Sequence, residues 1–345
     1  MTKKRKKMTP FKTLAEVTVI DLKKNDKFAD LGGRDLSELL IELEVAPLVL
    51  RRRLVLGENV TFGMEIEFEN ALQKNVEEKL SKFTPRWEVH SDRSVEIYDR
   101  FGRTLGGEVV SPILMDEPKT YRDLEKVCEI LRQENAAFYN AGGHIHLGSQ
   151  IINENFGGLM NFLKTWTAFE EIIFRFAYGD KLGARRDISC YARPIGEQLK
   201  PKLSRLARLG NLRALVNELP ERRDIAVNFC NFVRAGRAKD TLEFRCPNGS
   251  LSPVVWQNNL NFFAKLLTCC GGKNFDGDMV DRKLGKPRYD GNFYQMTNQV
   301  FLKDAVNLVD MVFGNNLDKA YFLKQYVKFL HEPKSDEQNT LVYMV

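Results

Sequence analysis

Between Val60 and Asn70 the sequence is Val-Thr-Phe-Gly-Met-Glu-Ile-Glu-Phe-Glu-Asn, and apolar and other residues alternate strictly along it. One set comprises Phe62, Met64, Ile66 and Phe68, and the other comprises Thr61, Gly63, Glu65, Glu67 and Glu69. Alternation with a period of two is typical of a β-strand that buries one face. The segment therefore predicts a sheet whose second face carries Glu65 and Glu67, roughly 7 Å apart along the strand.

Two carboxylates at this spacing destabilise a strand unless something offsets their repulsion. On a strand face in contact with water, solvent and salt screen the repulsion. The pair Glu65 and Glu67 alone is therefore compatible with a solvent-facing strand as well as with a site that binds cations.

Two further pairs repeat this spacing. The pair His144-Ile145-His146 follows the turn residues 140–143 and contains two of the four histidines of the chain, which favours a metal or phosphate site. The pair Glu243-Phe244-Arg245 places a carboxylate and a guanidinium on one strand face. Each pair alone is also compatible with exposed polar side chains or an ordinary ion pair.

Together the pairs and the acidic residues between them predict one polar sheet face. Its members are Glu65, Glu67, Glu96, Glu108, His144, His146, Glu243 and Arg245. So many carboxylates on one face require cations, and hard oxygen ligands with few imidazoles suit Mg²⁺ or Mn²⁺ better than Zn²⁺. Because Mg²⁺ sites commonly share a few carboxylates with substrate phosphates, the pattern favours nucleotide chemistry.

The rest of the chain predicts helices mixed with short strands. Helices are predicted near residues 36–50, 120–135, 159–178, 195–218, 254–267 and 317–330, and further strands near 94–98, 106–111, 144–148, 225–229 and 241–246. The elements intermix without a regular βαβ rhythm. We therefore expect an α+β fold with a largely antiparallel sheet.

Composition limits the class of protein. The 345 residues are 43% hydrophobic and 28% charged, as in soluble globular proteins, and a net charge of +6 suits anionic ligands. Six cysteines without CxxC spacing favour a reducing, cytoplasmic location. No apolar run approaches the roughly 20 residues of a membrane helix. Apart from residues 3–7 and 51–53, lysines and arginines are scattered, which argues against nucleic acid as a partner.

Five stretches, in this order, resemble the amidoligases of the glutamine synthetase and glutamate–cysteine ligase (carboxylate–amine ligase) superfamily. They are residues 62–68, His90 to Glu96, Gly107 to Pro112, Asn140 to Gly148 and Thr241 to Arg245. The resemblance covers about residues 58–270. It implies a curved, largely antiparallel sheet with helices on its convex face, where ATP enters one end of a concave funnel and the substrate enters the other. The expected organisation is an N-terminal extension (1–57), a catalytic domain (58–331) and a C-terminal tail (332–345).

The resemblance also implies roles for the site residues. The implied metal ligands are Glu65, Glu67, Glu96, Glu108, His144 and Glu243. Glu65 and Glu67 resemble ligands of different Mg²⁺ ions, and Asp92 is an alternative to Glu96. His146 is similar to a residue that contacts the nucleotide phosphates, and Arg245 to the cation that meets the transferring phosphate.

The sequence departs from the family pattern at two points. Arg93 lies between Asp92 and Ser94, where the family often has glycine, which puts the local turn in doubt. A further substrate-contacting arginine or asparagine has four candidates, which are Arg185, Arg186, Asn228 and Arg234.

The function expected from the resemblance is ATP- and Mg²⁺-dependent joining of a carboxylate to an amine through an acyl phosphate, with Glu67 and Arg245 as catalytic residues. Substrates would be small molecules or peptides, while the acid, the amine, the general base and the oligomeric state stay open. Two alternatives are a metal-dependent hydrolase that uses the same cluster and a non-catalytic binding protein.

Overall fold

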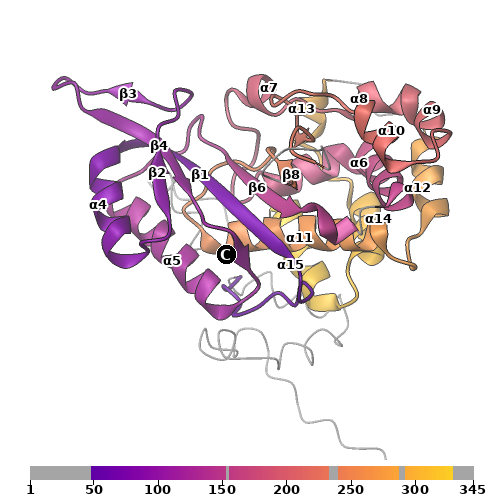
Figure 1. Ribbon diagram of the computed structural model, residues 1–345, viewed down its shortest axis with the longest axis horizontal. Coiled ribbons are helices and arrows are strands. Elements are labelled where there is room, and N and C mark those ends of the chain that lie inside the picture. Colours follow the sequence, from indigo (N-terminus) through magenta and orange to yellow (C-terminus); the bar gives the residue numbers. More distant parts are fainter. Residues whose placement is uncertain (1–47, 153–154, 233–239, 287–291, 329–345) are drawn as a thin grey trace, which may run out of the picture.

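The structure, a computed structural model, describes residues 48–152, 155–232, 240–286 and 292–328 (Figure 1). The basic residues 3–7, the tail 332–345 and Arg234 lie outside the described residues. So does most of the helix predicted at 36–50, whose described end, residues 48–50, is not helical.

The described chain is α+β, and its sheet is antiparallel and does not close on itself. The strands are β1 (Thr61–Leu72), β2 (Glu88–His90), β3 (Ile97–Tyr98), β4 (Thr104–Val110), β5 (Leu114–Met115), β6 (Gly143–Gly148), β7 (Val227–Asn228) and β8 (Thr241–Phe244). Their order is β2-β4-β1-β6-β8-β7, while β3 pairs with β4 and β5 pairs with β1. Every one of these pairings is antiparallel, as the sequence predicts.

The strand predicted at 94–98 is shorter than expected. A side-chain oxygen of Asp92 accepts from the backbone N–H of Ser94 at 2.8 Å, and the carbonyl of Asp92 accepts from the N–H groups of Val95 and Glu96. These bonds hold a turn, so that pairing with β4 begins only at Ile97. The strands β2 and β5, of three and two residues, are too short to show a period in the sequence.

The longer helices are α4 (Gln73–Phe83), α5 (Pro118–Gln133), α6 (Phe156–Ala177), α11 (Pro253–Gly271), α12 (Gly277–Leu284), α14 (Leu302–Val312) and α15 (Asn316–Val327). Short ones are η1 (Ser149–Ile152), α7 (Ile188–Tyr191), α8 (Gly196–Leu199), η2 (Lys200–Lys202), α9 (Leu203–Ala207), α10 (Leu212–Asn217) and α13 (Phe293–Met296). The helices predicted near 120–135, 159–178, 254–267 and 317–330 correspond to α5, α6, α11 and α15. The one or two helices predicted at 195–218 are divided into the shorter α8, η2, α9 and α10, and the sequence pattern does not predict α4, α12 or α14.

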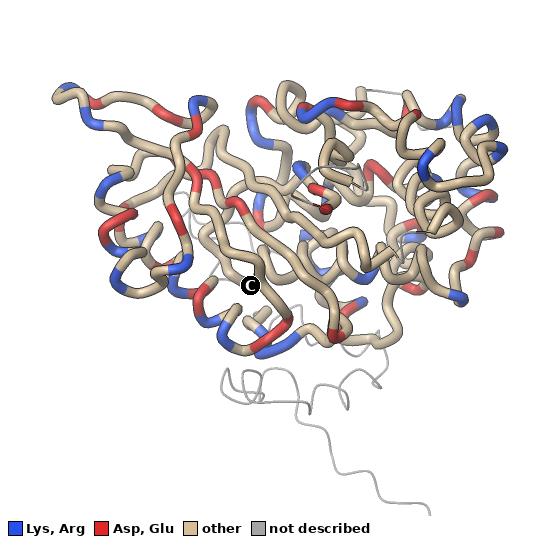
Figure 2. The backbone as a smooth tube through the Cα atoms, in the orientation of Figure 1, with Lys and Arg blue, Asp and Glu red and all other residues tan. Residues whose placement is uncertain are grey.

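The described helices and the distribution of charged residues bear on possible contacts with membranes and nucleic acids. None of the described helices has the length and apolar character needed to cross a membrane. Lysines and arginines are spread over helices and loops at both ends of the molecule and are not gathered in one stripe (Figure 2).

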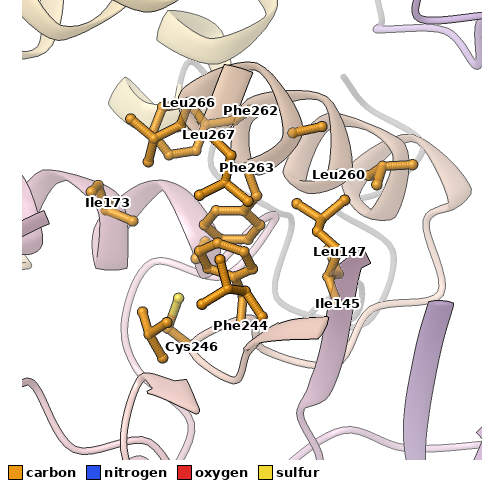
Figure 3. Packing of buried hydrophobic residues seen from close by; sticks show 14 of the residues in the cluster. Ile145, Leu147, Ile173, Phe244, Cys246, Leu260, Phe262, Phe263, Leu266 and Leu267 are labelled. Carbon is orange, nitrogen blue, oxygen red and sulfur yellow. The ribbon is translucent and has the colours of Figure 1, made fainter. Parts of the chain in front are cut away.

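The apolar face of the sheet packs against α6 and α11. Figure 3 shows Ile145, Leu147 and Phe244 beside the residues of α11. The ring of Phe244 stacks on Phe263 with centroids 4.3 Å apart, and Trp166 lies 5.8 Å from Phe244. Because this face is dry and fixed, alternate residues of the same strands must point to the opposite face.

A buried ionic network ties the segment before β1 to α11 and α15. Asp318 accepts from Arg51 Nη1 at 2.6 Å and from Lys265 Nζ at 2.6 Å. The backbone of Arg51 exchanges two hydrogen bonds with the side chain of Gln257, at 2.7 and 2.6 Å. Burial would raise the pKa of Asp318, but the charges of Arg51 and Lys265 outweigh it and hold the pKa well below its usual range.

Replacing Asp318 with Asn should destabilise the protein by about 3 kcal/mol, because the buried Arg51 and the partly buried Lys265 lose their counter-charge. Asp310 is the matched control, since it pairs with Lys319 while half-exposed at 51%, and Asp310→Asn should cost under about 1 kcal/mol. Denaturant unfolding of both variants checks this. Equal midpoints would contradict the assignment of stability to the buried network.

Candidate active site

The strand register gathers four of the predicted residues. Glu65 of β1 lies opposite His144 of β6, and His146 lies opposite Glu243 of β8. Directly opposed residues of antiparallel strands point to the same face. Three adjacent strands therefore place both histidines and both carboxylates on the polar face of the sheet.

The four side chains meet closely. His144 Nδ1 lies 2.5 Å from one carboxylate oxygen of Glu65, and His146 Nε2 lies 3.0 Å from the other. Glu243 Oε1 is 3.6 Å from His144 Nδ1. One ligand atom from each of the four residues lies within 4.8 Å of the other three, which is compact enough to surround a metal ion.

The donor set fits a divalent cation. The Nε2 atoms of His144 and His146 are buried, and their carboxylate neighbours, Glu67 Oε1 at 3.3 Å and Glu65 Oε1 at 3.0 Å, are not aligned as good hydrogen-bond acceptors. Buried polar atoms left this way are costly, and a cation would satisfy them. Carboxylate oxygens joined by imidazoles are compatible with Mg²⁺ or Mn²⁺.

The histidines and carboxylates shift one another's pKa values. Burial alone would raise the pKa of Glu65, but its bonds to His144 and His146 hold it well below the usual range. Burial would also raise the pKa of Glu67, yet His144 and Arg185 lower it to about 2. Burial and Arg245 oppose the charging of His144, but Glu65 and Glu67 outweigh them and raise its pKa to about 9. A protonated imidazole of His144 thus offsets part of the negative charge of these carboxylates.

Glu108 lies beside this group and not within it, while Glu96 belongs to the turn that follows Asp92. Glu108 is opposite Glu67 in the register, and burial together with the charge of Glu65 raises the pKa of Glu108 to about 7. The charge of Asp92 contributes to that shift, so Asp92 is also near. Glu96 follows the Asp92 turn, and its Oε1 is buried without a hydrogen-bond partner.

Arg245 lies at the edge of the cluster. It follows β8 directly, and its Nη1 donates to Glu243 and lies 3.5 Å from His144 Nδ1. Its Nε donates to the carbonyl of Tyr191 at the end of α7, at 3.2 Å. One segment outside the strands, the end of α7, therefore helps to fix this guanidinium beside the carboxylates.

The structure separates the candidates that the sequence left open. Asn228 is buried and its Nδ2 donates to Glu243 Oε2 at 2.6 Å, so it orients a cluster residue. Arg185 is buried and donates to the carbonyls of Pro247 and Arg245, while Arg186 is exposed.

Glycines 142 and 143 are required by close packing. A Cβ on Gly142 would overlap the guanidinium of Arg185, and one on Gly143 would overlap Trp256. The backbone N–H of Gly142 also donates to Glu67 Oε2 at 2.6 Å. The two glycines therefore let the turn before β6 come close enough to bind Glu67.

A cavity of about 310 Å³ adjoins the cluster at Glu65 and His146. The strands contribute small residues to it, Thr61, Gly63 and Gly148, and Pro112 and Ile113 add an apolar wall. The sequence pattern does not predict this cavity, because alternation indicates which face a side chain occupies but not where small side chains leave an empty space. Gly63 within β1 was the available signal.

One comparison with known proteins identifies a family. A family model described as "putative amidoligase enzyme" matches residues 58–267, which is more than half of the chain. The match includes every residue discussed above as part of the cluster or its cavity. No curated protein matches the chain.

Cation binding should release protons, because His144 with a pKa of about 9 and Glu108 with a pKa of about 7 must lose them before ligation. Mn²⁺ affinity should therefore rise with pH from about pH 6 to pH 9 and then level off. Titration calorimetry in buffers of different ionisation enthalpy would measure the released protons. An affinity that does not change with pH would contradict the expected exchange.

Proposed function

Because the chain belongs to this amidoligase family, we propose that it is an ATP- and Mg²⁺-dependent ligase that joins a carboxylate to an amine. We also propose that its sheet corresponds to the catalytic sheet of the glutamine synthetase and glutamate–cysteine ligase superfamily, within a catalytic domain of residues 58–331. The observation that carries the proposal is the cluster of Glu65, His144, His146 and Glu243, which opens directly on a cavity.

Two cation positions account for the polar face. Glu65, His144 and Glu243 would hold one ion, since their donor atoms converge. The second would be held by Glu67, Glu96 and Glu108, with Asp92 as the alternative to Glu96. The raised pKa of Glu108 supports this second position. Burial and the charge of Glu65 disfavour the ionised form of Glu108, and a bound cation would stabilise that form. When bound, the cations supply charge neutralisation for the phosphates of the nucleotide.

The nucleotide fits the cavity side of the cluster. His146 belongs to the metal-binding group and also lines the cavity, so its imidazole can contact the phosphates from there. The mostly apolar cavity, at about 310 Å³, is at the lower end of the size range of ligand pockets and suits a base. The carboxylate substrate then approaches from the opposite side, near Glu67 and the turn that contains Gly142.

The proposed reaction has two steps. A carboxylate oxygen of the substrate attacks the terminal phosphorus of ATP. The bond between this phosphorus and the ADP oxygen breaks, ADP leaves, and an acyl phosphate is formed. The amine then attacks the acyl carbon, the C–N bond forms, inorganic phosphate leaves and the amine loses a proton. Arg245 stabilises the charge on the phosphoryl group in transit, and removing such a fixed cation costs on the order of 10²-fold in rate.

The same cluster without nucleotide would suit a metal-dependent hydrolase, but nothing in the site favours that reading over the family match. An activity assay distinguishes the ligase from the hydrolase. A ligase releases ADP only when an acid and an amine are both present, whereas a hydrolase cleaves its substrate without any nucleotide. Substrates of the ligase would be small molecules or peptides that carry these groups.

Replacing Glu67 with Ala should lower ADP formation by on the order of 10²-fold or more while the protein stays folded, because a cation ligand is lost. Glu77→Ala, an exposed carboxylate of α4, is the matched control and should behave like the parent. Steady-state ADP assays and circular dichroism would measure both effects. ADP production at the parent rate in Glu67→Ala would refute the metal assignment.

Filling the cavity should weaken nucleotide binding selectively. A Cβ on Gly63 has ordinary contacts, 3.7 Å from His146 Cβ and from Ser111 Oγ, so Gly63→Ala should be tolerated. The longer side chain of Gly63→Leu should raise the KM for ATP on the order of 10-fold. If Gly63→Leu raised only the KM of the acid, the cavity would belong to the acid instead.

A further inference from the structure

Glu69, the third acidic residue of β1, lies outside the metal-binding group and binds a loop. Its Oε2 accepts from three successive backbone N–H groups, those of Tyr139 at 2.5 Å, Asn140 at 3.0 Å and Ala141 at 3.5 Å. Its Oε1 accepts from the side-chain Nδ2 of Asn140 at 3.0 Å. Hydrogen bonds to a charged acceptor are roughly twice as strong as neutral ones, so the carboxylate holds this loop firmly.

The same loop continues directly into the site. The next backbone N–H, that of Gly142, donates to Glu67 Oε2 at 2.6 Å, and β6 with His144 follows at once. Two carboxylates at i and i+2 of β1 thus bind consecutive N–H groups of one turn. On the far side, the backbone of Glu69 is itself paired with Ala137 by two bonds of 2.9 and 2.8 Å.

We propose that Glu69 is a positioning residue that acts through the loop 139–142 and Gly142 on Glu67. With the loop fixed, the Gly142 amide occupies Glu67 Oε2 and leaves Oε1 turned toward His144 Nε2, 3.3 Å away, on the side where cations would bind. This role rests on the proposed function in one respect, that Glu67 is a cation ligand. Outer partners that orient metal ligands commonly account for 10- to 100-fold in metal affinity.

The role can be tested without any ligase assay, by titrating the protein with Mn²⁺ and following free Mn²⁺ by electron paramagnetic resonance. Glu69→Ala should weaken Mn²⁺ binding on the order of 10-fold. In a Glu67→Gln background the same change should have little further effect, because Glu69 acts through Glu67. Mn²⁺ binding that is the same in the parent, Glu69→Ala and Glu67→Gln would overturn the proposal, as would fully additive losses.

Exchanging the carboxylate of Glu69 and the amide of Asn140 tests whether Glu69 acts by positioning the loop or whether its replacement simply destabilises the fold. Asn140→Asp puts a second carboxylate against Glu69 Oε1 and should weaken Mn²⁺ binding like Glu69→Ala. Adding Glu69→Gln should restore it, since the Gln amide then donates to Asp at 140 while its oxygen keeps the backbone N–H groups. Failure of Glu69→Gln to rescue Asn140→Asp would overturn the role of Glu69.

Two controls complete the test. Glu77→Gln removes an exposed charge of α4 and should leave Mn²⁺ binding unchanged, and melting temperatures of all variants identify any that fail to fold. Mn²⁺ binding that responds as expected in a protein that does not bind ATP would refute the proposed ATP-dependent ligase and leave the role of Glu69 standing.

Discussion

The pairing of Glu65 with His144 across β1 and β6 is the constraint on which the site depends. A carboxylate at this depth is stable only with a partner, and the imidazole opposite supplies one at 2.5 Å. The pairing is enforced by the other side of the sheet, where Ile145 and Phe244 are fixed against α11. A slip of one residue would turn the apolar residues outward and the charged ones into the core, so the core and the site fix the same register.

Much of this could be predicted from sequence because it depends on strict alternation. The period of two in β1 assigns Glu65 and Glu67 to one face, and the same period places His144 with His146. The antiparallel α+β class also follows from the order of the elements. These predictions need only local geometry, and the register confirms that the strands bring Glu65, His144 and Glu243 together.

Other features could not be predicted, because they depend on contacts between distant segments. The Asp92 turn shortens β3 through a side-chain bond that competes with strand pairing. Asn228 could not be separated from Arg186 until β7 was seen to pair beside Glu243. Glu69 looked equivalent to its neighbours on β1, yet the bulge between Phe68 and Leu72 and the turn from Tyr139 give it a different partner.

The buried contact between Arg51 and Asp318 joins two segments that both lie outside residues 58–267. Leu50, Leu54 and Leu56 belong to the same hydrophobic core as the sheet. A fragment cut to the borders of the family match would therefore expose an apolar groove along α11 and leave Lys265 without its counter-ion. Truncated forms and evolutionary comparisons of this protein should therefore treat the segments on either side of the family match as parts of the fold.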